Sequence, residues 1–297
     1  MFFFGFGNSA PEPKVIDYIT ISTTGNAIDF GDMSGDTTFY GGVMGVNRTR
    51  AIYAGGYVPN NAPTYSTNII QFVDVSSTGN SQDFGDLTAI TTYNPSGVSN
   101  NTRAIRCGGA TTPTSSINVL DYVTIASTGN ANDFGDLYFG TRESGGCNSP
   151  TRGIVKGGSP THSNVIQFIT ISTQGDSADF GDTTVAASRG LGSGSNAVRG
   201  VLHLGYTPTV LNTVDFITIA TLGNAQDFGD LTEARFQAGG AASTTRLVVM
   251  GGSTPSVVDT MDYAQIMTTG NFIDFGELVG SDRAQTGGCS NGHGGLG

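Results

Sequence analysis

The chain has 297 residues, with 45 glycines, only 12% charged residues and a formal net charge of -11. This composition is poor in good helix formers and is typical of turn-rich all-β proteins. The acidic charge disfavours a nucleic-acid-binding protein, because phosphates are bound by a basic stripe that the chain lacks. It disfavours binding to an anionic membrane surface as well. No segment approaches the roughly eighteen consecutive apolar residues of a membrane-spanning helix. The composition therefore predicts a soluble all-β protein.

The predicted elements begin with a short apolar strand, "FFFGFG" at 2–7. No basic residues precede it, and Gly and Pro interrupt the apolar stretch, so a secretory signal peptide is not expected. A run that alternates apolar and polar residues follows at 14–23, "KVIDYITIST", and such alternation predicts a half-buried strand. The segment "TGNAIDFGDM" at 24–33 opens with turn residues, because Gly accepts positive φ and Asn caps its own backbone. It continues as an outer strand.

A small-residue segment near 37–45 and a strand that closes on paired glycines, "RAIYAGG" at 50–56, come next, and then the alternating run returns. This order repeats along the chain. Its clearest marker is Asp-Phe-Gly, whose aspartates stand 54, 50, 46, 48 and 47 residues apart, and a period of about 40–50 residues is that of one propeller blade. The marker pairs are Asp29 and Phe30, Asp83 and Phe84, Asp133 and Phe134, Asp179 and Phe180, Asp227 and Phe228, and Asp274 and Phe275.

Six copies of the marker exclude a kinase, in which a single Asp-Phe-Gly turn holds magnesium. Repetition at the blade period instead indicates a structural role. We expect the Asp to accept backbone N–H bonds, the Phe to fill the space between neighbouring blades, and the Gly to let the outer strand bend. Pairs such as Asp29 with Asp32 offer oxygen ligands for calcium, which is the alternative, although the acids are sparser than in calcium loops. Neither a metal nor a cofactor is otherwise expected.

The order of small-residue strand, Gly-Gly strand, aromatic strand and outer strand resembles the kelch repeat over nearly the whole chain. The resemblance implies a β-propeller of four-stranded antiparallel blades. It departs from kelch because the chain has no Trp, and the marker phenylalanines are expected to take that packing position. Six small-residue segments are present, whereas five Gly-Gly strands follow Thr24, so "FFFGFG" supplies the sixth. We therefore expect one six-bladed all-β propeller over 1–297, without a linker or anchoring domain, in which three N-terminal strands complete the last blade.

Two series of arginines recur in the repeats. The first series opens the small-residue strand and is expected near one mouth of the central channel, where it either pairs with carbonyls and an Asp of the next blade or binds an anion. Its members are Arg142, Arg189, Arg235 and Arg283. The second series opens the Gly-Gly strand on the opposite face and is expected to be structural. Its members are Arg50, Arg103, Arg152, Arg199 and Arg246.

The connections after the Gly-Gly strands differ in length and are all expected on one face. Loops on a rigid scaffold are where recognition usually lies. The longest carries Tyr57, Asn60, Asn61 and Tyr65, an amphipathic mixture suited to sugars or protein surfaces. Two shorter connections contribute His162 and Tyr206 as further candidate binding residues. The alternative is that Pro and Thr simply stiffen these surface loops.

Catalysis is not expected. His162, His203 and His293 are the only histidines, and none belongs to a plausible triad with an Asp and a Ser or Cys. Phosphate-loop and zinc-helix motifs are absent, and the copper constellation of Tyr and His that an oxidase of the kelch class needs cannot be assembled. The three cysteines, at 107, 147 and 289, are expected to be buried or half-buried free thiols.

Tandem copies of "TGNAxDFGDL" also resemble repeats in structural proteins of tailed phages, especially marine ones. The resemblance implies a non-enzymatic virion protein, used for decoration or associated with the tail fibre, that is made in the host cytoplasm. Its partners would be capsid, tail or fibre proteins and a glycan or protein of the host surface, with no nucleic acid and no membrane insertion. The alternative is a free carbohydrate-binding propeller or a protein adaptor.

Overall fold

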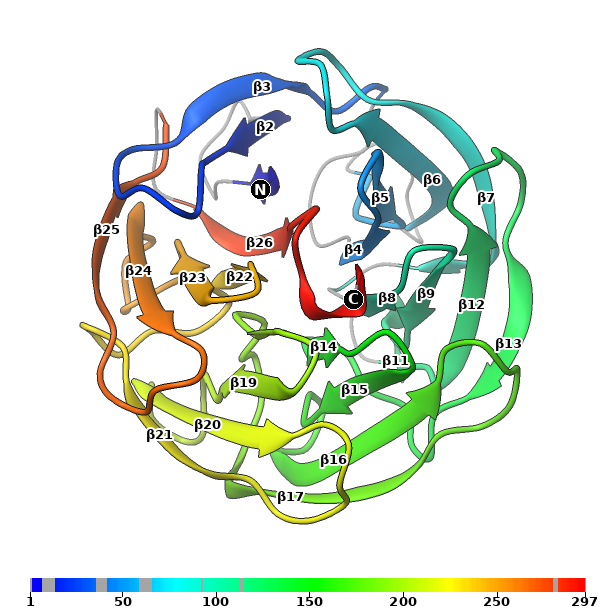
Figure 1. Cartoon of the computed structure of the whole chain (residues 1–297). Helices are drawn as coiled ribbons and strands as arrows, with labels where there is room; N and C mark the ends of the chain where they lie inside the picture. The colour runs from blue at the N-terminus through cyan, green and yellow to red at the C-terminus, as the bar shows by residue number, and fades with distance from the viewer. Residues whose placement is uncertain are drawn as a thin grey trace.

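The computed structural model describes residues 2–6, 14–35, 42–58, 66–91, 93, 95–112, 115–279 and 283–296. Its four-stranded antiparallel sheets stand around a common centre, with their innermost strands facing the axis (Figure 1). This arrangement confirms the all-β propeller that the repeats predict.

Five blades are each formed from one continuous stretch of chain, and we name them B to F. In each of them the chain runs from the innermost strand to the outermost. Blade B has β4 (Gly42–Val46), β5 (Arg50–Ala54), β6 (Thr67–Asp74) and β7 (Gln82–Thr91), and blade C has β8 (Ser96–Ser99), β9 (Arg103–Cys107), β12 (Val119–Thr124) and β13 (Asn132–Asp136). Blade D has β14 (Gly145–Asn148), β15 (Arg152–Lys156), β16 (Ser163–Thr170) and β17 (Ala178–Ala187), and blade E has β18 (Gly194–Ser195), β19 (Arg199–His203), β20 (Thr213–Thr218) and β21 (Gln226–Asp230). Blade F has β22 (Gly239–Ala242), β23 (Arg246–Met250), β24 (Thr260–Gln265) and β25 (Ile273–Glu277), and a short hairpin of β10 (Ala110–Thr112) and β11 (Ser115–Ser116) lies within blade C's second connection.

The remaining four-stranded sheet, blade A, is composite. Its strands are β26 (Ala284–Cys289), β1 (Phe2–Phe6), β2 (Val15–Tyr18) and β3 (Ile28–Asp32). β1 pairs antiparallel with β26 and places Phe2 opposite Cys289. Where the sequence predicts six blades, the structure has five that are continuous in the chain and this one sheet assembled from both ends. The β1–β26 pairing joins the two ends of the chain and gives the composite sheet four strands like the other sheets, so both ends are held within one sheet.

Neighbouring blades cover one another, and this burial explains the composition of the second strands. In β15 and β23, every residue after the opening Arg is buried, because these strands are packed on both faces and need no polar side. One apolar cluster lies at each blade junction; that between blades E and F contains Val201, Phe228 and Leu247. Burial of each such side chain contributes roughly 1.5–3 kcal/mol.

The antiparallel order divides the connections between two faces. The turns from first to second strand and from third to fourth strand lie on one face, which we call the turn face. The connections from second to third strand and from each blade to the next lie on the other, which we call the loop face. The variable loops predicted as binding elements belong to the loop face.

Candidate functional site on the loop face

The repeat marker joins each blade to the preceding one. The residue after each turn glycine, Asn or Asp, accepts a hydrogen bond from the backbone N–H of the second acid of the preceding marker. The same turns add backbone bonds, such as that of 2.7 Å from Gly129 N to Phe84 O. The six side-chain bonds measure 3.0–3.2 Å and join Asp32 to Asn80, Asp86 to Asn130, Asp136 to Asp176, Asp182 to Asn224, Asp230 to Asn271 and Glu277 to Asn26. The first acid of the marker, the Asp before Phe, is exposed in all six copies. It was expected to accept backbone N–H bonds, but the side chain that accepts them is the Asn or Asp in the turn of the next blade.

The marker glycine lies where the next blade approaches most closely. Gly181 has a φ of +145°, and a Cβ on it would stand 2.5 Å from Gly223 O. Gly223, in the turn that makes this contact, has a φ of +148° but open space around the missing Cβ. Both positions favour glycine through their backbone angle, whereas only Gly181 also requires it for the contact.

We expect Gly181→Ala to destabilise the fold by about 2 kcal/mol more than Gly223→Ala. Both substitutions place a side chain at positive φ, at a cost of roughly 1–3 kcal/mol. Only Gly181→Ala also presses a methyl group against backbone, and such overpacking costs about 1–3 kcal/mol. Urea denaturation followed by circular dichroism measures the difference in the free energy of unfolding. Equal losses for both variants would show that the two blades can move apart to accommodate the methyl group at little cost.

The marker phenylalanines and the second arginine series pack around the same aromatic rings. Each marker Phe is buried and meets the aromatic residue of its third strand edge-on, with ring centroids 5.7–6.3 Å apart. An Arg of the second strand covers that ring in blades B to F, at 4.3–4.9 Å from its centroid. The guanidinium also donates to a carbonyl of the next blade, as Arg152 Nη1 does to Ile219 O at 2.9 Å. Both sets of residues therefore hold the blades together.

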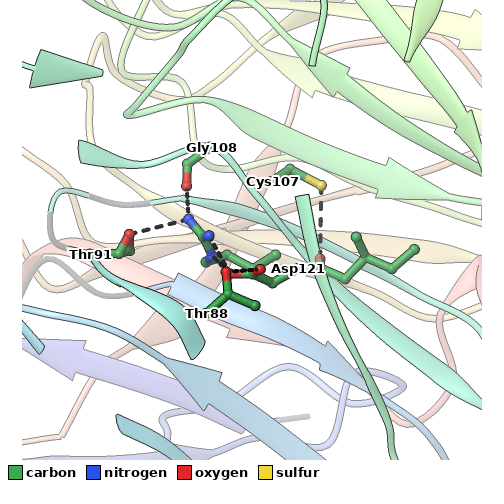
Figure 2. A network of polar contacts seen from close by, with 7 residues as sticks. Thr88, Thr91, Cys107, Gly108 and Asp121 are labelled. Carbon is green, nitrogen blue, oxygen red and sulfur yellow. Dashed lines mark hydrogen bonds and ion pairs between the residues drawn. The ribbon is translucent and has the colours of Figure 1, made fainter. Parts of the chain in front are cut away.

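A buried polar side chain on each third strand faces the preceding blade. It is Asp17, Gln71, Asp121, Gln167, Asp215 or Asp262. In blade C, Asp121 forms an ion pair with Arg106 of β9, whose Nη1 also donates to Thr91 Oγ1 at 3.2 Å. Figure 2 shows the groups around this buried guanidinium: Thr88, Thr91, Gly108 and Asp121. In the blades whose third strand carries Gln in place of Asp, a Ser hydroxyl is the partner in place of an Arg guanidinium. In blade D, Ser177 Oγ donates a 2.8 Å bond to Gln167 Oε1.

The structure corrects the expected arginine series at the channel mouth. Arg235 and Arg283 are only 0% and 2% exposed and pair with Asp262 and Asp17 of their own blades. Arg142 donates to Ser116 Oγ, at 2.9 Å, in the neighbouring hairpin. Arg189 is half-buried, and its backbone belongs to the hydrogen-bonded edge of the mouth. The four residues do not share one structural position: Arg189 is itself the left-handed residue that precedes its inner strand, whereas Arg235 and Arg283 stand two places before the left-handed Gln237 and Gln285.

A chain of backbone hydrogen bonds borders the channel mouth on the loop face. It runs from Arg189 N to Glu143 O at 3.0 Å, from Gln237 N to Arg189 O at 2.7 Å, and from Gln285 N to Gln237 O at 2.7 Å. All four residues have φ between 52° and 60°. Such left-handed conformations cost roughly 1–3 kcal/mol each and persist where the surroundings impose them. The mouth is therefore a defined, preorganised edge, unlike a freely moving loop.

Aromatic side chains from three connections meet at this edge. The Arg189 guanidinium lies over Tyr206 and Phe236, at 5.2 and 5.7 Å from the ring centroids. His162 stands 5.7 Å from Tyr206, centroid to centroid, and is exposed, whereas Tyr206 and Phe236 are half-buried. His162 Nδ1 lies 3.0 Å from Ser188 Oγ. Because Ser188 is only 2% exposed, this is a positioning bond, and it offers no accessible nucleophile.

A carboxylate fixes the polar side of the same group. Glu143 Oε2 lies 3.4 Å from Arg189 Nε and accepts a 2.9 Å bond from Ser159 Oγ. Its other oxygen accepts a 2.7 Å bond from Gln237 Nε2. We call these residues the mouth cluster: Glu143, His162, Arg189, Tyr206, Phe236 and Gln237.

No protein-family model matches the chain, and no curated protein matches it either. The functional assignment therefore depends on the residues themselves.

The structure brings together only some of the predicted binding residues. His162 and Tyr206 join in the mouth cluster. Tyr57 is half-buried against the apolar cluster of the A–B junction, and it lies near Tyr93, whose pKa is raised by burial and then by Tyr57. Asn60, Asn61 and Tyr65 lie outside the described residues.

Three members of the mouth cluster were not predicted from the sequence. Glu143, Phe236 and Gln237 come from connections between blades, and Gln237 reaches Glu143 across 94 residues of sequence. One sequence feature marks three of the six members: all the described left-handed residues that are not glycine stand just before a segment rich in small residues. Aligning the repeats on that position would have grouped Glu143, Arg189 and Gln237.

The central channel contains a cavity of about 710 Å³, a volume that includes space open to solvent. Its wall is built from small side chains of the innermost strands, such as Gly97, Ser193 and Ala241. At the turn face, the end of the chain folds into it as a single 3₁₀ turn, η1 (Gly294–Leu296). His293 anchors this segment through Asn148 Nδ2 at 2.9 Å and Val46 O at 2.8 Å. Burial lowers the pKa of His293 to about 4, so the ring is neutral at pH 7.

The remaining titratable groups offer no exposed reactive centre within the part of the chain that the structure describes. The expected free thiols are confirmed: all three are buried, and burial raises the pKa of Cys107, Cys147 and Cys289 to about 12. His203 is fully buried, and burial together with neighbouring Lys156 and Arg235 lowers its pKa to about 3. Within the described ranges, no three His, Cys, Asp or Glu side chains gather as metal ligands. No helix among the described residues is long and apolar enough to span a membrane.

Proposed function

We propose that this protein is a non-enzymatic binding propeller of a phage particle, used for decoration or associated with the tail fibre, that contacts its ligand with the loop face. The proposal places it with capsid, tail or fibre proteins after synthesis in the host cytoplasm. It also takes the blades as kelch-like and six in number, counting the composite sheet, with Phe in the packing position of the missing Trp.

One observation carries the binding role: among the described connections between strands, only those of the loop face carry accessible aromatic side chains. They are Tyr57, Tyr93, Tyr138, Phe139, His162, Tyr206 and Phe236, all exposed or half-buried. The described turns of the opposite face contain no exposed aromatic side chain. Aromatic residues supply contact area at low entropic cost and dominate binding energetics. The buried ion pairs and thiols, in contrast, are committed to packing.

The phage setting is supported by the resemblance of the tandem "TGNAxDFGDL" segments to repeats of tailed-phage structural proteins. The alternative is a free carbohydrate-binding or adaptor propeller, which the same loop face would serve. In both proposals we expect one binding site and not six equivalent pockets, because the connections that form the mouth cluster differ in sequence and length.

Quantitative mass spectrometry of gradient-purified particles from the source lysate tests the setting. We expect this chain at a fixed whole-number ratio to the major capsid or tail protein. A ratio that varies between preparations, or absence from the particles, would contradict the virion role and leave the free binding propeller. Salt-washed particles serve as the control, because a docked component stays bound while an adsorbed one is released.

A further inference from the structure

We propose that the mouth cluster binds a saccharide that carries a carboxylate, with Arg189 holding the carboxylate and the aromatic side chains holding the sugar ring. The assignment rests on the proposed function, because it names the ligand class for the same loop face.

Arg189 is held in a fixed orientation with one edge open. Glu143 holds its Nε at 3.4 Å, and its Cζ lies over the rings of Tyr206 and Phe236. Its side chain nevertheless remains 38% exposed, and no hydrogen bond to a described residue uses Nη1 or Nη2. These two nitrogens form a planar fork that matches the two oxygens of a carboxylate. Because the guanidinium is already held in place, little conformational entropy is lost on binding.

The local charge favours an anion with a single negative charge. Glu143 is 7% exposed on its side chain and sits beside the guanidinium, and the whole chain carries -11. A doubly charged phosphate monoester would be repelled by this surrounding charge more strongly than a carboxylate. The planar geometry of a carboxylate also fits the Arg fork.

The remaining surface of the cluster suits a sugar ring. His162 is exposed and Tyr206 half-buried, and their rings are inclined to each other by 52°, so the cluster presents aromatic faces together with polar edges. A pyranose has the matching character, with an apolar C–H face and hydroxyl groups around it. An apolar peptide side chain would instead need a deep pocket to be desolvated. The exposed hydroxyl residues Thr161 and Thr209 belong to the same two connections as His162 and Tyr206.

Isothermal titration of the parent protein with uronic-acid oligosaccharides is the first test of the assignment, and variants then locate the contact. The probes are oligogalacturonate, oligomannuronate and a glucuronate-containing tetrasaccharide, each compared with its neutral methyl ester. We expect at least one acid to bind about 10-fold more tightly than its ester. Arg189→Met should abolish this preference, and Tyr206→Ala should weaken binding of both acid and ester. Arg48→Met is the matched control, because it removes the same charge from the opposite face, where Arg48 is exposed.

Each other result overturns the assignment. Equal binding of acid and ester, lost in Tyr206→Ala but retained in Arg189→Met, would refute the carboxylate contact and leave the loop-face function standing. Equal loss in Arg48→Met would reveal a net-charge effect only. Binding of peptides with a free C-terminal carboxylate, with no saccharide bound, would assign the site to a protein partner. Failure of every saccharide would refute the ligand class, while the particle measurement decides the virion role separately.

Discussion

Replacing Arg106 with Val should destabilise the protein by about 3–5 kcal/mol, the usual loss when one partner of a buried ion pair is removed. Arg106 and Asp121 are both fully buried. Thr88 Oγ1, at 2.5 Å from Asp121 Oδ1, would remain as a partner of the carboxylate, but one hydroxyl cannot replace a guanidinium. Urea denaturation monitored by circular dichroism measures the loss.

The repeat architecture supplies a specific rescue for this variant. Blade D solves the same position without charge: Val155, Gln167 and Ser177 stand where blade C has Arg106, Asp121 and Ala131. The triple variant Arg106→Val, Asp121→Gln and Ala131→Ser should therefore recover most of the lost stability. The physical reason is that Ser and Gln satisfy each other, as Ser177 Oγ and Gln167 Oε1 do at 2.8 Å, so no uncompensated buried charge remains.

Two controls make this result decisive. Asp121→Gln alone should be as harmful as Arg106→Val alone, because it leaves a buried guanidinium without its counter-ion. Ala131→Ser alone should change stability by less than about 1 kcal/mol, because Ala131 is only half-buried against the apolar cluster of the B–C junction. A triple variant as unstable as Arg106→Val would show that the blades are not interchangeable at this position.

The fold was predictable because its signals are periodic. Thr-Gly-Asn turns, Gly-Gly strand ends and alternating third strands recur at the blade period, and each has a local physical cause in turn geometry or half-burial. Small inner residues follow equally from crowding at the axis: a Cβ on Gly97 would stand 2.0 Å from Val43 O of the adjoining inner strand. Sixfold repetition lets such local rules be read six times.

The contacts that give the site its shape have no such period. The marker Asp was expected to accept backbone N–H bonds, yet the acceptor is the Asn or Asp after the turn glycine of the next blade. A repeated motif does not reveal whether its partner lies in the same copy or in its neighbour. Arg189 and Arg235 both precede an innermost strand in the sequence. Arg189, however, is at the left-handed position, whereas Arg235 is buried within its blade. Register, more than residue type, separates the exposed guanidinium from the structural one.

Lys156 should make the stability of the protein depend on pH, because it is a buried amine without an adjacent ion-pair partner among the described residues. The side chain is 1% exposed, and its Nζ lies 3.5 Å from Leu204 O. Burial lowers the pKa of Lys156 from 10.5 to about 7, partly opposed by the charge of Asp215. Asp215 is itself held by Thr184, through bonds of 2.8 Å from both N and Oγ1. His203 stays neutral in the folded state above pH 6.5, since its pKa is about 3.

Stability should therefore rise as the pH increases from 7 to 10, through the contribution of Lys156. Between its folded pKa of about 7 and its unfolded pKa of 10.5, the unfolded state binds the extra proton, so raising the pH favours folding. Lys156→Met removes the buried amine and should be more stable than the parent at pH 7, with an advantage that shrinks by about 3 kcal/mol by pH 10, at roughly 1.4 kcal/mol per pKa unit. Lys156→Arg is the control, because a guanidinium keeps its charge throughout this range and should give no rise. Thiol ionisation in the unfolded chain cancels when variants are compared at the same pH. If Lys156→Met were less stable by the same amount at both pH values, the amine would be a necessary donor to Leu204 O rather than a cost to the fold.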